Sequence, residues 1–216
     1  MFLRREALLA RERDPYGWAL CSLRRKLKTG VYAGGEPLPI TDLAREFRLS
    51  PTPVREALAH LAGGGLIEDR RGHGYYAWRL EAPDLAELYD LHALVVGGAL
   101  TAATTQSEAI RACEAVEGDP AEAVFRALVE ASGARTLIGL YRGLVIRLGP
   151  VRTMEAEVLD DLAGEAIALA EALEARRWPA LGQEIAAYHQ RRQSCVTAIA
   201  AALRKQSQRR YNIGHI

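Results

Sequence analysis

The chain has 216 residues, of which 49% are hydrophobic and 25% charged, a composition typical of one or two soluble globular domains. Three widely spaced cysteines without a Cys-x-x-Cys pair argue against a disulfide framework or a zinc cluster. No stretch approaches the roughly 18 apolar residues of a membrane span, and the first 14 residues are too charged for a signal peptide. We therefore expect a cytoplasmic protein without membrane contact.

Charge is unevenly distributed along the chain. Residues 1–80 hold 14 Lys and Arg against 9 Asp and Glu, whereas residues 81–203 hold 10 against 18. From Arg204 onward there are four basic and no acidic residues. A basic first third is typical of a chain in which one module touches a polyanion and the other does not.

The first 39 residues lead up to the strongest signal. Residues 1–14 lack a clear helical period and are expected to form a flexible extension. From Pro15 a helix is predicted, ending near Gly30, with these residues turned inward: Trp18, Leu20, Leu23 and Leu27. A loop rich in Gly and Pro follows up to Pro39.

Residues 40–61 predict a helix-turn-helix. Apolar residues recur at helical spacing on two short faces, Leu43, Ala44 and Phe47, then Val54, Leu58 and Leu61. Between the faces, Ser50 is a natural N-cap whose hydroxyl can accept a bond from a first-turn amide. Pro51 suits the first helical position. Two short helices joined by such a turn form a helix-turn-helix.

A β-hairpin is predicted directly after the second helix. Residues 63–78 indicate a helix stop, a short strand, a turn punctuated by glycine and a second strand. The turn at residues 70–74 is basic and narrow enough to approach a phosphate backbone. We therefore expect a winged helix-turn-helix over residues 15–78, with Thr52 and Arg55 at the leading end of the helix that enters a major groove.

Two short amphipathic helices in any all-α protein would share the pattern of residues 40–61, and the helices alone leave that alternative open. The hairpin and its basic turn favour the DNA-binding interpretation, because the combination is far more specific than either part.

The run from Leu27 to Tyr76 resembles the DNA-binding domain of GntR-type bacterial transcriptional regulators, above all in the string TPVREAL at residues 52–58. The resemblance implies a homodimer that represses or activates from a palindromic operator in double-stranded DNA. It also implies that the contacts fall on one residue of the first helix, three of the recognition helix and two of the wing: Arg45, Ser50, Thr52, Arg55, Arg71 and Gly72.

Two positions depart from this family pattern. Many relatives carry Arg where this chain has Pro51, so one DNA contact is absent. Many carry Gly where this chain has Arg48, in a turn expected to be left-handed, which costs a non-glycine residue about 1 kcal/mol. The operator sequence therefore cannot be carried over from relatives.

After a linker at residues 79–82, nearly everything is predicted helical, in segments near 83–104, 107–117, 119–132, 134–149, 151–177 and 179–206. Ala and Leu dominate and short turns separate the segments, including one at Gly149-Pro150. We expect an antiparallel all-α bundle over residues 83–206 for effector binding and dimerisation, then a solvated basic tail at 207–216. The fold class is thus mainly α.

The helical part resembles the effector-binding (FCD-type) domain of the FadR-like branch of that family, over weaker strings such as PDLAELYDLHALVVGGALTAA. Many relatives hold a divalent metal there through one Asp and three His, and the metal helps to seat a carboxylate. The matching positions here are Glu122, Arg126, Ala166 and His189. Arg and Ala leave too few ligands, so we expect no metal cofactor. The first helix also carries His92 and Val96 where relatives usually carry Arg and Glu.

Two interpretations of Arg126 stay open. Its guanidinium could grip an acidic effector, since it pairs bidentately with carboxylates, or it could form an ion pair with Glu122, four residues earlier, which the pattern favours. His189 is more often a satisfied interior histidine than a ligand. Arg142 and Arg147 would line the same cavity or face solvent. These five residues are the candidate effector site.

Three classes of function remain. The first is a sequence-specific DNA-binding regulator, a repressor on balance, whose operator affinity responds to a small acidic metabolite. The second is a DNA-binding regulator whose helical domain only dimerises. The third, an all-α enzyme, lacks support, because we find no nucleophile–base pair, phosphate loop or convergent His/carboxylate cluster. The sequence therefore indicates a regulator and not an enzyme.

Overall fold

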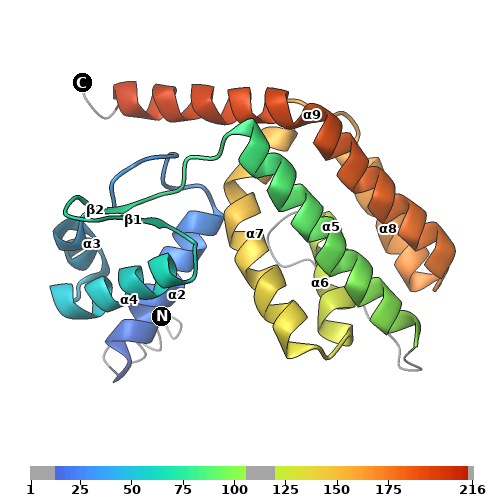
Figure 1. The fold of residues 1–216 in the computed structure, drawn as a ribbon, viewed down its shortest axis with the longest axis horizontal. Helices are drawn as coiled ribbons and strands as arrows, with labels where there is room; N and C mark the ends of the chain where they lie inside the picture. Colours follow the sequence, from blue (N-terminus) through green and yellow to red (C-terminus); the bar gives the residue numbers. More distant parts are fainter. Residues whose placement is uncertain (1–12, 106–119, 214–216) are drawn as a thin grey trace, which may run out of the picture. The chain divides into compact units, whose positions relative to one another are not determined.

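The computed structural model describes residues 13–105 and 120–213 and divides into two compact units. Unit 1 comprises Met1–Arg79 with Arg204–Ile216, and unit 2 comprises Leu80–Leu203. The described residues form eight helices and one two-stranded sheet (Figure 1). The expected mainly α fold is confirmed. The helix expected at 107–117 and most of the expected N-terminal extension lie outside the described residues.

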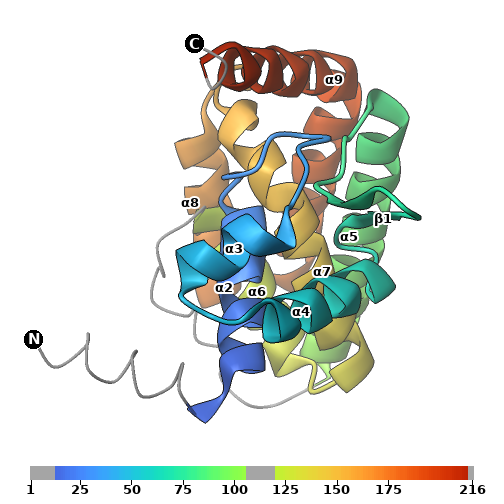
Figure 2. The same cartoon turned by 90° about the vertical axis from the view of Figure 1, so that its left-hand side faces the viewer.

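Unit 1 is built on three helices, α2 (Pro15–Lys28), α3 (Ile40–Phe47) and α4 (Pro51–Gly63). Their apolar faces meet in one core, where Leu23, Phe47 and Leu58 are buried and α4 packs against both other helices. Figure 2 shows the short turn that joins α3 to α4. The helix-turn-helix therefore has the interior that the apolar spacing predicted.

The turn between α3 and α4 has one expected and one unexpected feature. Arg48 takes the left-handed conformation (φ 54°, ψ 48°) that the sequence predicted. Ser50 occupies the N-cap of α4, but its side chain makes no capping hydrogen bond, so that expectation is wrong. The reason is local, since Pro51 and Pro53 lack N–H groups and Thr52 carries the remaining amide of the first three helical positions.

The predicted hairpin is present as strands β1 (Glu68–Arg70) and β2 (Gly74–Tyr76), which pair antiparallel. Gly72 and Gly74 have φ of 77° and 92°, conformations that favour glycine. The segment before α3 runs beside β2, because the Leu38 N–H donates to the Tyr75 carbonyl at 2.8 Å. The wing is thereby tied to the entrance of the helix-turn-helix.

Unit 2 is a helical bundle of α5 (Ala82–Thr104), α6 (Pro120–Ala131), α7 (Arg135–Glu155), α8 (Leu162–Glu174) and the part of α9 (Trp178–Ile213) up to Leu203. α6 is its central helix, since every residue from 121 to 129 except Arg126 is buried. α6 packs against α5, α7 and α8. Glu122 of α6 therefore faces other helices and not solvent, whereas Glu130 near the end of α6 is exposed.

Two helix boundaries differ from the sequence prediction. α7 runs through Pro150 to Glu155, because Leu148, Gly149 and Val151 are buried and their packing holds the proline within the helix. The break comes later, where Asp161 caps α8 by accepting a hydrogen bond from the Gly164 N–H at 3.1 Å. The predicted helix 151–177 is thus wrong.

The basic tail also differs from its prediction. α9 continues to Ile213 instead of ending at residue 206, since no Gly or Pro interrupts residues 204–213.

One helix of the described part, α5, is long and apolar enough to cross a membrane by length and composition alone. The core helix of a bundle passes the same test, and α5 packs against α6 and α7. We therefore interpret its apolar length as core packing.

Candidate functional site

The leading end of α4 presents a polar face. Thr52 and Arg55 are exposed, whereas Val54 and Leu58 of the same helix are buried. Ser50 is exposed just ahead of them, and its hydroxyl is not used as a cap. Helices of this kind enter a major groove with their first turns, so the arrangement is suited to contact base edges and phosphates.

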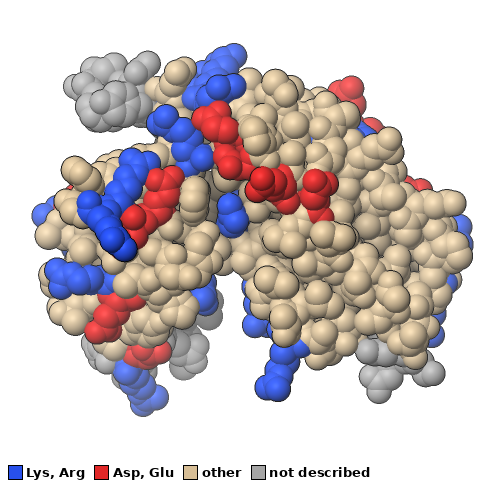
Figure 3. Space-filling view, in the orientation of Figure 1, with Lys and Arg blue, Asp and Glu red and all other residues tan. Residues whose placement is uncertain are grey.

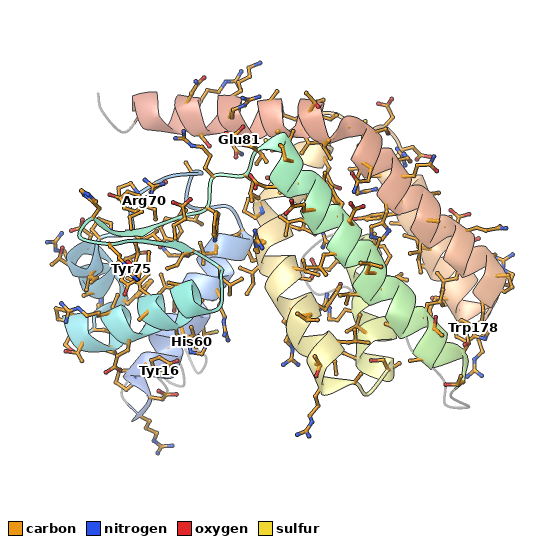
Figure 4. The ribbon with its side chains drawn as sticks, in the orientation of Figure 1. Tyr16, His60, Arg70, Tyr75, Glu81 and Trp178 are labelled. Carbon is orange, nitrogen blue, oxygen red and sulfur yellow. The ribbon has the colours of Figure 1, made fainter. Side chains whose placement is uncertain are left out.

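The two neighbouring arginines of the wing, Arg70 and Arg71, have different surroundings. The Arg70 guanidinium carbon lies 4.0 Å from the centre of the Tyr76 ring, and its Nε donates to Glu68 Oε2 at 2.8 Å. These contacts hold Arg70 on its strand (labelled in Figure 4). Arg71 and Gly72 form the exposed tip of the turn. Arg71 is therefore the better placed of the two to reach a phosphate.

Arg45 of α3 is exposed and pairs with Asp42, three residues earlier, at 3.3 Å. A pair on the surface is worth at most about 1 kcal/mol, so it leaves Arg45 able to exchange this partner for a phosphate. Figure 3 shows basic side chains, with acidic ones between them, on the visible face of unit 1.

A surface contact fixes the far end of α4. The Tyr16 hydroxyl lies 2.9 Å from Nδ1 of His60, and an Arg24 guanidinium nitrogen lies 3.3 Å from its Nε2 (Figure 4). A guanidinium can only donate, so Nε2 accepts and the Nδ1–H donates to Tyr16. Sequence reasoning missed this contact, because its members lie 36 and 44 residues apart.

Unit 2 contains a second group of polar side chains, His92, Glu122, Arg126, Arg152 and His189, which we call the polar cluster. Arg152 donates to Glu122 Oε2 at 2.5 Å, and both side chains are buried. Arg126 also pairs with Glu122, but at 3.8 Å, beyond hydrogen-bond distance. Arg152 is thus the main partner of the Glu122 carboxylate.

The two histidines of the polar cluster are hydrogen-bonded to each other. His189 Nδ1 donates to the Ile185 carbonyl at 2.7 Å, so its Nε2 accepts from His92 Nδ1 at 2.8 Å. Burial lowers the pKa of His189 to about 4 and lowers the pKa of His92 well below its usual value. Both rings are therefore neutral near pH 7.

The structure brings together three of the five predicted effector residues, Glu122, Arg126 and His189. Arg142 is exposed on α7. Burial lowers the pKa of Arg147, and the charges of Asp84 and Glu87 oppose that shift, so Arg147 lies near the start of α5. Its surroundings are therefore acidic groups of α5.

Ala166, at the fourth family metal position, is buried on α8 and offers no ligand atom. Among the described residues, no three His, Cys, Asp or Glu side chains are grouped to hold a metal ion. The expected loss of the metal stays a prediction.

Sequence reasoning missed Arg152 and gave His92 no role. Arg152 meets Glu122 across 30 residues of sequence, and His92 meets His189 across 97. The available signals were Arg152, one of four arginines on α7, and His92, the one histidine of α5. Such signals show that a partner is needed, but they do not identify it.

The first unit matches known proteins in sequence. Residues 15–76 match the family model described as bacterial regulatory proteins, gntR family. The chain is 38% identical over 61 residues to the Nta operon transcriptional regulator of Aminobacter aminovorans, covering 28% of this chain and 29% of that protein. It is 32% identical over 69 residues to the uncharacterized HTH-type transcriptional regulator YdhC of Bacillus subtilis, covering 32% and 31%. The matches thus span about a third of these relatives.

The similarity in fold extends over both units. A crystal structure described as a putative GntR transcriptional regulator from Rhodococcus sp. RHA1 aligns over 86% of this chain and 98% of its own, with a TM-score of 0.68 and 17% identity. This likeness supports the fold alone. An N-terminal domain of the gntR type, followed by a helical domain, is therefore the common architecture.

Proposed function

We propose that this chain, whose first domain is of the gntR type, is a sequence-specific DNA-binding transcriptional regulator that acts in the cytoplasm. The observation that carries the proposal is the exposed polar start of α4 beside a basic wing. Thr52 and Arg55 would read base edges, with Ser50 and Arg45 on the backbone, and Arg71 and Gly72 would approach a phosphate. The proposed role is binding and not catalysis.

The test begins with selection of genomic fragments by the purified chain, which yields an operator. Arg55→Ala should then weaken operator retention by about 1–3 kcal/mol and leave helical content intact, because Arg55 is exposed and outside the core. Arg135→Ala removes an exposed arginine at the start of α7 and serves as the matched control. Unchanged retention by the Arg55 variant would refute its assigned role.

The proposed regulator is a homodimer on a palindromic operator, since one winged head contacts one half-site. Three large apolar side chains are exposed on α5 and α7, which pack against each other: Leu91, Leu94 and Leu140. We propose that these leucines contact a second copy of the chain, which brings two heads to the same duplex.

The polar cluster supports an effector site in unit 2, in the manner of the FadR-like branch. A small acidic metabolite bound there would bias the freedom or spacing of the two DNA-reading heads and so lower operator affinity, as in a repressor. The competing proposal, that the helical domain only dimerises, draws on the same exposed leucines. A ligand that raises the melting temperature and weakens operator retention excludes that alternative.

A further inference from the structure

The end of α9 carries a basic segment to which the proposed function assigns no role. From Arg204 onward the chain has four Lys and Arg and no Asp or Glu. The segment is helical to Ile213 and does not form the solvated tail that the sequence predicted (Figure 1). The backbone therefore holds these cations at helical spacing.

Exposure follows the helical period along this segment. The exposed positions are residues 204, 205, 208 and 209, and the half-buried ones are residues 202, 203, 206 and 207. The exposed positions hold three cations and one amide, which we call the α9 basic face: Arg204, Lys205, Arg209 and Gln208. The same side of α9 holds only Thr and Ala at its earlier exposed positions, 197, 198 and 201. Positive charge thus begins on this side where unit 2 ends, at Leu203.

The basic segment belongs to the unit that contains the helix-turn-helix. Unit 1 takes in residues 204–216, whereas the earlier part of α9 belongs to unit 2. Residues 81–203 hold 10 Lys and Arg against 18 Asp and Glu, and residues 1–79 hold 14 against 9. The α9 basic face therefore adds to the positive charge of the basic unit and is not part of the acidic one.

The chemistry of the α9 basic face fits a phosphate backbone. From Arg204 to Arg209 the helix rises about 7.5 Å, and one DNA strand carries a phosphate about every 3.4 Å of axis. The Lys and Arg side chains can each pair with phosphate oxygens, and the Gln208 amide can donate to another. The four residues include no carboxylate that would repel the strand and no aromatic ring that would stack on a base. Backbone contact is therefore favoured over base reading.

We propose that the α9 basic face binds the phosphate backbone of double-stranded DNA, as a second contact besides α4 and the wing. The inference rests on the proposed function, because it takes the chain to be a DNA-binding regulator. The contact carries no sequence information, since every duplex presents the same phosphates. It raises the affinity for operator and unrelated DNA alike, and it weakens as salt increases, because the bound cations release counterions from the DNA.

The experiment replaces Lys205 and Arg209, one helical turn apart, by Ala together in the full chain. Ala is the best helix former, so α9 should keep its helical content. On the selected operator and on an unrelated duplex, the slope of log affinity against log salt should fall by about 2 for each bound chain. Between about 50 and 200 mM salt, the wild type should therefore lose about tenfold more affinity for each bound chain than the variant.

Two further variants serve as controls. Arg135→Ala with Arg177→Ala removes two exposed arginines of unit 2, changes the net charge equally and should keep the wild-type slope. Lys205→Arg with Arg209→Lys should keep it too, because the contact depends on charge. An unchanged slope in the variant that lacks both cations, or an equal reduction in the unit 2 control, would overturn the proposal. Tighter DNA binding without those cations would also overturn it and would assign them to acidic groups of this chain.

Chemical modification of Lys205 tests the contact without any variant. Its side chain is exposed in the DNA-free chain, and Lys26 and Lys28 of α2 are the other lysines of the sequence. Bound DNA should slow the acetylation of Lys205 severalfold, as measured by peptide mass spectrometry. Full reactivity of Lys205 in the DNA complex would refute this contact alone, whereas a wild-type chain that binds no duplex would refute the proposed function, so the two failures can be told apart.

Discussion

The guanidinium carbon of Arg192 lies 3.3 Å from the centre of the Tyr188 ring, and its nitrogens hold the carboxylate of Glu155 at 2.9 and 3.0 Å. Another of its nitrogens reaches Glu165 on α8, and Tyr89 of α5 donates to Glu155 at 2.8 Å. One buried arginine of α9 thus connects three other helices of unit 2.

Replacing Arg192 by Met should destabilise the chain by about 3–5 kcal/mol, because the buried carboxylates of Glu155 and Glu165 would lose their main counter-charge. Urea unfolding followed by circular dichroism measures the change. Arg191→Met, at a side chain that is 38% exposed and also pairs with Glu165, should cost about 1 kcal/mol or less. Similar losses for both would show that burial of Arg192 adds little.

Arg71 of the wing is expected to contact phosphate and not a base edge. Arg71→Ala should weaken binding by a similar factor on every DNA sequence and reduce the slope of log affinity against log salt by about 1. Titrations of operator and unrelated duplexes at several salt concentrations provide the measurement. A loss confined to the operator would instead assign Arg71 to base reading.

The left-handed Arg48 is a site for stabilisation. Arg48→Gly removes a backbone cost of about 1 kcal/mol, but it stabilises the unfolded chain by about 0.4–1 kcal/mol through added conformational entropy. A net gain of up to about 0.5 kcal/mol is therefore expected. Urea unfolding measures it. Arg45→Gly, inside α3, should lose about 1 kcal/mol. A loss in both variants would mean that the Arg48 side chain stabilises the turn.

Acid should destabilise unit 2 through its histidines. The folded pKa of His189 is about 4, against a usual 6.5, so protons bind the unfolded chain more readily. The contribution of neutral His189 to the free energy of unfolding is complete above pH 6.5 and is lost as the pH falls toward 4. At pH 5 the loss relative to pH 7 should be about 2 kcal/mol for this histidine.

Unfolding measured at pH values between 7 and 5 checks this expectation. The charged and titratable groups around His189 are Arg192, Arg152, Asp90 and His92. His189→Gln should reduce the slope of the curve, and His92, whose pKa burial also lowers, should account for the slope that is left. His60→Gln, at the exposed histidine of α4, should follow the wild type. Parallel curves for all three chains would remove His189 as the source.

Leu94 is 73% exposed on α5 and is one of the three leucines that we assign to a contact with a second copy. Leu94→Glu should convert a dimer to a monomer in light scattering, because it buries a charge in an apolar interface, and should weaken operator retention. Ile167→Glu, at a residue of α8 that is 57% exposed, is the matched control. Dimers of undiminished stability in Leu94→Glu would place the interface elsewhere.

Local patterns were sufficient for the helix-turn-helix and its wing. Apolar residues at helical spacing specify the two helices: Leu43, Phe47, Val54 and Leu58. Pro51 marks the start of α4, and glycines mark the turn of the hairpin. The contacts within these elements are short-range in sequence. The left-handed Arg48 was predictable for the same reason. The same local rules failed at Pro150, where buried neighbours keep a proline inside a helix.

The partners within unit 2 depend instead on how the helices pack. Nothing near Glu122 in sequence indicates that Arg152 is its closest cation, and nothing near His92 indicates that its ring ends a chain of hydrogen bonds from Ile185. Charge and hydrogen-bond complementarity act through space, across 30 and 97 residues of chain. Periodicity therefore reveals which faces of these helices are buried, whereas the packed bundle decides which polar atoms pair with one another.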